Sequence, residues 1–259
     1  MATLYSTSPD GILIAYEVTG HGPALMMLHG AGKTRRDWRR GGYVERLKDD
    51  FTVITVDIRG SGDSDSPIEI EDYGIEKIYA DLLSVADDCK VSQFSIWGYS
   101  FGGNIARYLG AWSDRITSVA IIGVPFGPAV DADFDRFIDE FIEKWEPLVQ
   151  AQQSDPLNEK AHRSVIKGRI PMWLSCFQAM RKWPSVEPGD VRCPAMLVVG
   201  TRNKNTMDWV LANRSELDTA DVCVAIVEGL NHMQEFTQID RVFPVVASFL
   251  FGHGCLHSD

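Results

Sequence analysis

Seven short apolar runs, each long enough for one β-strand, recur along this chain and restrict its fold more than any other feature. They are rich in Val, Ile, Leu and Met and occupy positions 12–18, 24–28, 51–56, 94–97, 119–124, 195–199 and 222–227. The runs do not alternate cleanly with polar residues, as a strand with one wet face does. Strands buried on both faces of a sheet have this pattern.

Amphipathic helical patterns separate most of these runs, notably at positions 73–86, 104–112 and 236–251. Strands that alternate with helices predict an α/β fold, in which a mostly parallel sheet carries helices on both faces. The chain is long enough for one such domain.

The segment 125–194 interrupts this alternation, because it contains no convincing strand but several helical patterns. Apolar residues lie on one side of the predicted helices at 133–145 and 171–183, and they include Trp173 and Phe177. A helical insertion after a strand's carboxyl end covers the crevice where open α/β sheets bind ligands. We therefore predict a core of residues 1–124 and 195–259 with a helical lid at 125–194.

Composition excludes several classes of function. The chain has 25 Lys and Arg against 36 Asp and Glu, a net charge of −11, which is the wrong sign for a nucleic-acid partner. The apolar runs are too short to span a membrane. Its five cysteines show neither pairing motifs nor zinc-ligand spacing. We expect reduced thiols, a cytoplasmic location, no metal and no cofactor.

The strongest chemical signal is the Gly-Tyr-Ser-Phe-Gly string at positions 98–102, which follows an apolar run and precedes a helix. A nucleophile on a sharp strand-to-helix turn needs small neighbours, because the backbone is strained and crowded there. The turn exposes the hydroxyl of Ser100 above the sheet. The following helix aims backbone N–H groups at developing negative charge.

A serine hydroxyl needs a base, and His232 is the best placed of the six histidines. It lies just past the last strand, at the same edge of the sheet as Ser100. A glycine-rich turn also follows the run 24–28. Its Ala31 N–H, together with that of Phe101, would form an oxyanion hole. His29 is predicted to brace this loop.

These motifs in this order resemble the α/β-hydrolase fold family. The resemblance rests on His29-Gly30, the turn at 57–64, the elbow at Ser100 and the late His232, and it covers nearly the whole chain. It implies an eight-stranded, mostly parallel sheet, a helical cap inserted before the last two strands, and a pocket between cap and core. It also implies that the turn at 57–64 is structural.

The chain departs from the family where the third member of a catalytic triad is expected. The residue three positions past the glycine that ends the penultimate strand is Asn203, and the alternative place, at 122–125, has no carboxylate. Three possibilities remain open. A displaced carboxylate serves, with candidates Asp208, Asp131 and Asp133; Asn203 orients the histidine as a neutral group; or the site is used for other chemistry or for binding only.

The predicted function is a cofactor-free serine hydrolase that cleaves an ester or lactone of a small apolar molecule through an acyl-enzyme on Ser100. His232 is the predicted base, and Tyr99, Trp173 and Phe177 are predicted to contact the substrate. One alternative is proton-shuttle chemistry on the same scaffold, as in lyases or cofactor-independent dioxygenases. Another is a ligand-binding receptor with an impaired triad.

Overall fold

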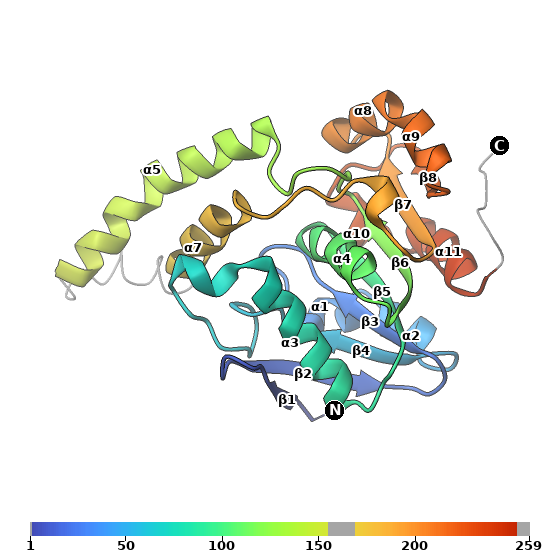
Figure 1. Cartoon of the computed structure of the whole chain (residues 1–259), viewed down its shortest axis with the longest axis horizontal. Helices are drawn as coiled ribbons and strands as arrows, with labels where there is room; N and C mark the ends of the chain where they lie inside the picture. Colours follow the sequence, from blue (N-terminus) through green and yellow to red (C-terminus); the bar gives the residue numbers. More distant parts are fainter. Residues whose placement is uncertain (1, 155–168, 253–259) are drawn as a thin grey trace.

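The computed structural model describes residues 2–154 and 169–252, whose strands form one eight-stranded sheet (Figure 1). The strand order is β1-β2-β4-β3-β5-β6-β7-β8, and β2 is antiparallel to both of its neighbours while the other pairs are parallel. The strands are β1 (Leu4–Thr7), β2 (Leu13–Thr19), β3 (Ala24–Leu28), β4 (Thr52–Val56), β5 (Phe94–Tyr99), β6 (Ile116–Ile122), β7 (Ala195–Gly200) and β8 (Cys223–Val227). The predicted mostly parallel sheet is confirmed.

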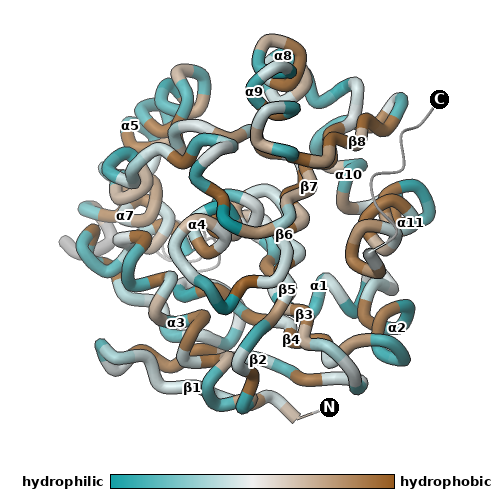
Figure 2. Tube along the Cα trace, turned by 45° about the vertical axis from the view of Figure 1, so that its right-hand side comes forward, coloured by the Kyte–Doolittle hydropathy of each residue, from teal (hydrophilic) through white to brown (hydrophobic). Residues whose placement is uncertain are grey.

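Helices cover both faces of the sheet. Helices α3 and α4 belong to the apolar cluster on one face, and α1, α2 and α11 contribute to the cluster on the other. Figure 2 shows hydrophobic stretches along the strands and on the side of α11 that faces them. The helices are α1 (Arg35–Arg40), α2 (Tyr43–Leu47), α3 (Ile75–Asp88), α4 (Phe101–Trp112), α5 (Ala132–Ser154), α7 (Ile170–Met180), α8 (Lys204–Ala212), α9 (Arg214–Thr219), α10 (Gln234–Thr237) and α11 (Ile239–Leu250).

The helical insertion lies between β6 and β7, as predicted. Its α5 extends away from the sheet in Figure 1 and packs against α7, where the ring of Phe177 meets those of Phe134, Phe137 and Phe141. Two predictions differ from the structure in detail. Strand β1 is missing from the predicted runs because only one of its four residues is buried. The pattern at 236–251 forms two helices, since the chain leaves helical geometry at Gln238.

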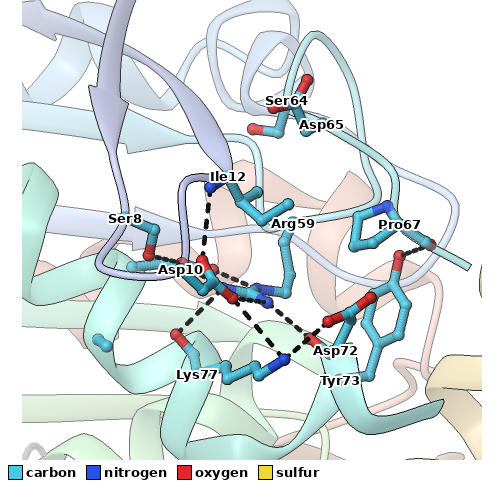
Figure 3. A network of polar contacts seen from close by, with 12 residues as sticks. Ser8, Asp10, Ile12, Arg59, Ser64, Asp65, Pro67, Asp72, Tyr73 and Lys77 are labelled. Atoms are coloured by element: carbon cyan, nitrogen blue, oxygen red, sulfur yellow. Dashed lines mark hydrogen bonds and ion pairs between the residues drawn. The ribbon is translucent and has the colours of Figure 1, made fainter. Parts of the chain in front are cut away.

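The turn at 57–64 has the structural role that the resemblance implies. Figure 3 shows Arg59 at the centre of a polar network, where its guanidinium donates to Asp10 at 3.0 Å and to the backbone oxygen of Asp72 at 2.7 Å. The same buried guanidinium donates to the buried Asp81 at 2.6 Å. The turn is thereby tied to the N-terminal hairpin and to α3.

Two further observations concern the predicted location. None of the helices in the described ranges has the length and apolar character needed to cross a membrane. Cys89, Cys176 and Cys193 are free thiols. Cys223 forms a disulfide, so the expectation of reduced thiols throughout is wrong for this residue.

Candidate active site

The elbow after β5 holds Ser100 in the strained backbone conformation that the glycine pattern predicts. Ser100 has φ 54° and ψ −116° at the N-cap of α4. A side chain at Gly98 would place its Cβ 2.3 Å from the Gly102 oxygen, and one at Gly102 would lie 2.1 Å from the Leu28 oxygen. Only glycine fits these two positions, and the turn therefore presents the hydroxyl at the carboxyl edge of the sheet.

His232 meets Ser100 at this edge, although 132 residues separate them. Its Nε2 lies 2.9 Å from Ser100 Oγ. The loop after β8 is held locally by Asn231, whose side-chain oxygen accepts the N–H of Gln234, the first residue of the short helix α10, at 3.0 Å. The Tyr99 hydroxyl donates to the backbone oxygen of His232 at 2.8 Å, and the two rings stack.

A carboxylate that the sequence analysis did not consider lies against the other ring nitrogen. Glu235 Oε2 is 3.1 Å from His232 Nδ1, and Oε1 accepts the Gly200 N–H at 2.7 Å. Glu235 is buried on α10, three residues after His232, and its backbone N–H donates to the Asn231 backbone oxygen at 3.0 Å, so the chain from His232 to Glu235 already turns back on itself.

Gly123, at the end of β6, provides the space for this carboxylate. Its φ is +80°, and a Cβ there would lie 2.3 Å from Glu235 Oε2 and 2.8 Å from His232 Nδ1. The alternative acid position after β6 is thus empty of side chain, and Glu235 fills the volume from another element. The available sequence signal was the His-x-x-Glu spacing at 232–235 combined with a glycine after β6.

Asn203 lies beside the carboxylate rather than standing in for it. Its Nδ2 is 3.0 Å from both Glu235 oxygens and 3.0 Å from the Gly123 carbonyl oxygen, and it also lies 3.3 Å from His232 Nδ1. The amide is almost completely buried. An amide donor stabilises a buried carboxylate, whereas a second carboxylate would repel it.

None of the three candidate replacement acids contacts the ring of His232 in the described part of the chain, although Asp131 lines the same cavity. Asp131 accepts the Phe134 N–H at 2.7 Å at the start of α5, and Asp133 pairs with Arg136 at 3.1 Å. Asp208 is exposed on α8. A displaced carboxylate does contact the ring of His232, but it is Glu235 and none of these three candidates.

The glycine-rich loop after β3 brings Ala31 to the same cavity as Ser100 and Phe101. His29 is fully buried below it, where its Nε2 accepts the Ile58 N–H at 3.2 Å and its Nδ1 lies 2.8 Å from the Gly30 oxygen. Burial lowers the pKa of His29, so the ring is neutral. These two contacts hold the loop in place, which is the structural role predicted for His29.

A cavity of about 470 Å³ opens above Ser100 and His232. Of the predicted substrate contacts, Phe177 lines it, whereas Tyr99 is buried beneath His232 and Trp173 lines a separate, smaller cavity. That Tyr99, Trp173 and Phe177 contact the substrate stays a prediction. The apolar wall of the cavity comes mostly from the helical insertion and from the segment between β6 and α5. Its residues are Val124, Pro125, Pro128, Ala129, Phe134, Phe137, Phe177 and Met180.

The fold and this site define a hydrolase scaffold, and the chain belongs to the alpha/beta hydrolase fold family, whose model matches residues 23–210. Among individual relatives, the chain is 31% identical over 129 residues to bifunctional epoxide hydrolase 2 of Mus musculus. That match covers 48% of this chain and 22% of the mouse protein. The chain therefore corresponds to less than a quarter of that relative's length.

Solved structures share the fold over nearly the whole chain. An epoxide hydrolase of Vigna radiata superposes with a TM-score of 0.77 at 17% identity, covering 97% of this chain and 98% of the other. An esterase of Exiguobacterium antarcticum superposes with a TM-score of 0.76 at 19% identity, covering 97% and 100%. These likenesses concern the fold.

Proposed function

We propose that this protein is a serine hydrolase that cleaves a carboxylic ester or lactone of a small, largely apolar molecule. The observation that carries the proposal is the continuous chain of contacts from Ser100 through His232 to Glu235 beside a largely apolar cavity. Such a chain of hydroxyl, imidazole and carboxylate is the general device for activating a serine.

Each group has a defined task in this reaction. Glu235 accepts a hydrogen bond from the Nδ1–H of His232, which leaves Nε2 unprotonated and able to take the proton of Ser100. Ser100 Oγ then attacks the substrate carbonyl, and the backbone N–H groups of Ala31 and Phe101 stabilise the oxyanion. His232 returns its proton to the leaving oxygen. A water activated by the same histidine then hydrolyses the acyl-enzyme.

The hydroxyl nucleophile favours a carboxylic ester over an epoxide, although two of the relatives above are named epoxide hydrolases. Attack of Ser100 on an ester carbonyl forms a new ester, which water cleaves by the same mechanism. Attack of Ser100 on an epoxide carbon would form an ether. Water and a general base do not cleave an ether under these conditions, so the enzyme would stop after one turnover.

A fluorophosphonate probe combined with a 4-nitrophenyl ester assay tests the proposal. We expect covalent labelling and ester turnover in the wild type, and loss of both in Ser100→Ala. Ser84→Ala, in the middle of α3, is the matched control and should retain both. Labelling without ester turnover would favour the proton-shuttle alternative. Ligand binding without labelling would favour the receptor alternative, and either result would overturn the hydrolase proposal.

A further inference from the structure

A buried arginine that no carboxylate of the described residues contacts lies behind one wall of the cavity. Arg107, on α4, has an exposed fraction of 0%. In the described part of the chain its guanidinium donates to the carbonyl oxygens of Pro125 at 2.6 Å and Gly127 at 3.1 Å, and its Nε has no hydrogen-bond partner. Burial lowers its pKa to about 10, which still leaves the group charged at neutral pH.

The third contact of this guanidinium orients a residue of the cavity wall. Arg107 Nη2 donates to Asn104 Oδ1 at 2.5 Å. A guanidinium offers only donors, so the atom of Asn104 that faces it must be the oxygen. Asn104 lines the cavity. Its Nδ2 is therefore the atom left to face the cavity, as a donor polarised by the positive charge behind it.

The position of this donor relative to Ser100 is set by the helix. Asn104 lies four residues after Ser100, and its backbone N–H donates to the backbone carbonyl oxygen of Ser100 at 2.9 Å. Ser100 is the N-cap of α4 and Asn104 lies in its first turn, and both residues line the same cavity. A substrate in this cavity can therefore place one oxygen against Asn104 while Ser100 attacks its carbonyl carbon.

The leaving oxygen must lie beside His232, which returns its proton, so the acyl group occupies the remainder of the cavity, which Asn104 also lines. We propose that Asn104 is a specificity-determining residue that donates a hydrogen bond to a second oxygen on the acyl group. The preferred substrates are then esters whose acyl group carries such an oxygen, of which esters of 3-oxo and 3-hydroxy acids are examples. This inference rests on the proposed hydrolase function, and it narrows the substrate class of that site.

The energetic reason is that the surrounding wall is apolar. A plain acyl chain leaves the Asn104 donor in the cavity without a partner when it displaces water, which disfavours that substrate. A 3-oxo or 3-hydroxy group satisfies the donor. Discrimination arises because a site built to hydrogen-bond an oxygen rejects the analogue that lacks it.

The test compares kcat/KM for ethyl 3-oxobutanoate and ethyl butanoate, whose acyl chains have the same length. The acid released by hydrolysis is titrated. The ratio for each variant is divided by the wild-type ratio, so the intrinsic reactivities of the two esters cancel. We expect Asn104→Ala to lower the ratio about 10-fold, the usual effect of one hydrogen bond. Asn104→Asp, which keeps the shape and the contact with Arg107 but cannot donate, should lower it at least as much.

Ser84→Ala is again the control, because Ser84 lies on α3 and is not among the residues that line the cavity. Its ratio should stay within about 2-fold of the wild type. An unchanged ratio in both Asn104 variants, with ethyl butanoate still hydrolysed, would overturn this inference and leave the hydrolase proposal intact. Hydrolysis of neither ester, with no fluorophosphonate labelling, would count against the hydrolase function itself.

Discussion

Exchanging the amide of Asn203 with the carboxylate of Glu235 is the sharpest test of how charge is arranged behind His232. Three variants are needed: Asn203→Asp, Glu235→Gln and the double variant that carries both changes. In the wild type one amide faces one carboxylate at 3.0 Å. Each single variant breaks this complementarity, whereas the double variant restores it with the two groups exchanged.

The distance sets the scale of the effect on stability. Two unit charges 3.0 Å apart repel by about 5.5 kcal/mol at an effective dielectric constant of about 20. Asn203→Asp can avoid this repulsion by binding one proton between the two carboxyls. At about pH 7 that proton costs about 4 kcal/mol for groups that ordinarily ionise near pH 4. We therefore expect Asn203→Asp to lower the free energy of unfolding by about 4 kcal/mol at that pH.

The pH dependence has a defined sign. The folded variant holds a proton that its unfolded chain releases, so its deficit grows with rising pH and shrinks as the pH falls towards about 4. At about pH 5 the deficit should be only about 1.4 kcal/mol. Urea unfolding of the four proteins at these two pH values measures this change directly, and the double variant should lack the deficit of Asn203→Asp.

Activity follows a different order. Glu235→Gln removes the charge that stabilises the protonated His232, and we expect kcat/KM for a 4-nitrophenyl ester to fall about 10⁴-fold. Asn203→Asp adds no missing charge and should not raise the rate. The double variant should have a higher kcat/KM than Glu235→Gln. Its Asn203→Asp change brings a carboxylate to the place of the Asn203 Nδ2 atom, which lies 3.3 Å from His232 Nδ1. A rate gain of orders of magnitude in Asn203→Asp alone, or strictly additive effects, would refute this reasoning.

Three further predictions concern the support of the site. Gly123→Ala should lower kcat/KM by at least about 100-fold, because its Cβ would collide with the carboxylate behind the histidine. Its control is Gly127→Ala, at φ +96° but with the nearest neighbouring atom 4.0 Å from the added Cβ, which should show the backbone strain in urea unfolding with little loss of activity. Burial lowers the pKa of His29, so below about pH 6.5 the unfolded chain binds a proton at this residue that the folded protein does not. The free energy of unfolding therefore falls as the pH decreases from there, and unfolding titrations of His29→Asn should show a shallower fall. Asp81→Asn removes the buried one of the two carboxylates that contact Arg59 and should cost about 3–5 kcal/mol in chemical unfolding, whereas a loss below about 1 kcal/mol would contradict the role of that network.

Local sequence patterns determined much of the fold and part of the candidate active site. The apolar runs are strands because residues buried on both faces of a sheet must all be apolar, and Gly98 and Gly102 mark the elbow because no side chain fits there. His232 was found from its place after the last strand, since the carboxyl ends of parallel strands meet at one edge. These features depend on neighbours along the chain or on a regular topology, and a sequence displays both.

The third residue of the site depended on the tertiary structure. Glu235 left only the His-x-x-Glu spacing as a signal in the sequence, and it contacts His232 because α10 points it into space that Gly123, just after β6, leaves open. The side-chain oxygen of Asn104 likewise accepts from Arg107, whose guanidinium is held in place by the carbonyl oxygens of Pro125 and Gly127 beyond β6. Which side chain fills a volume, and which atom it turns outward, follows from packing between segments far apart in the chain, and this information is absent from any one stretch of sequence.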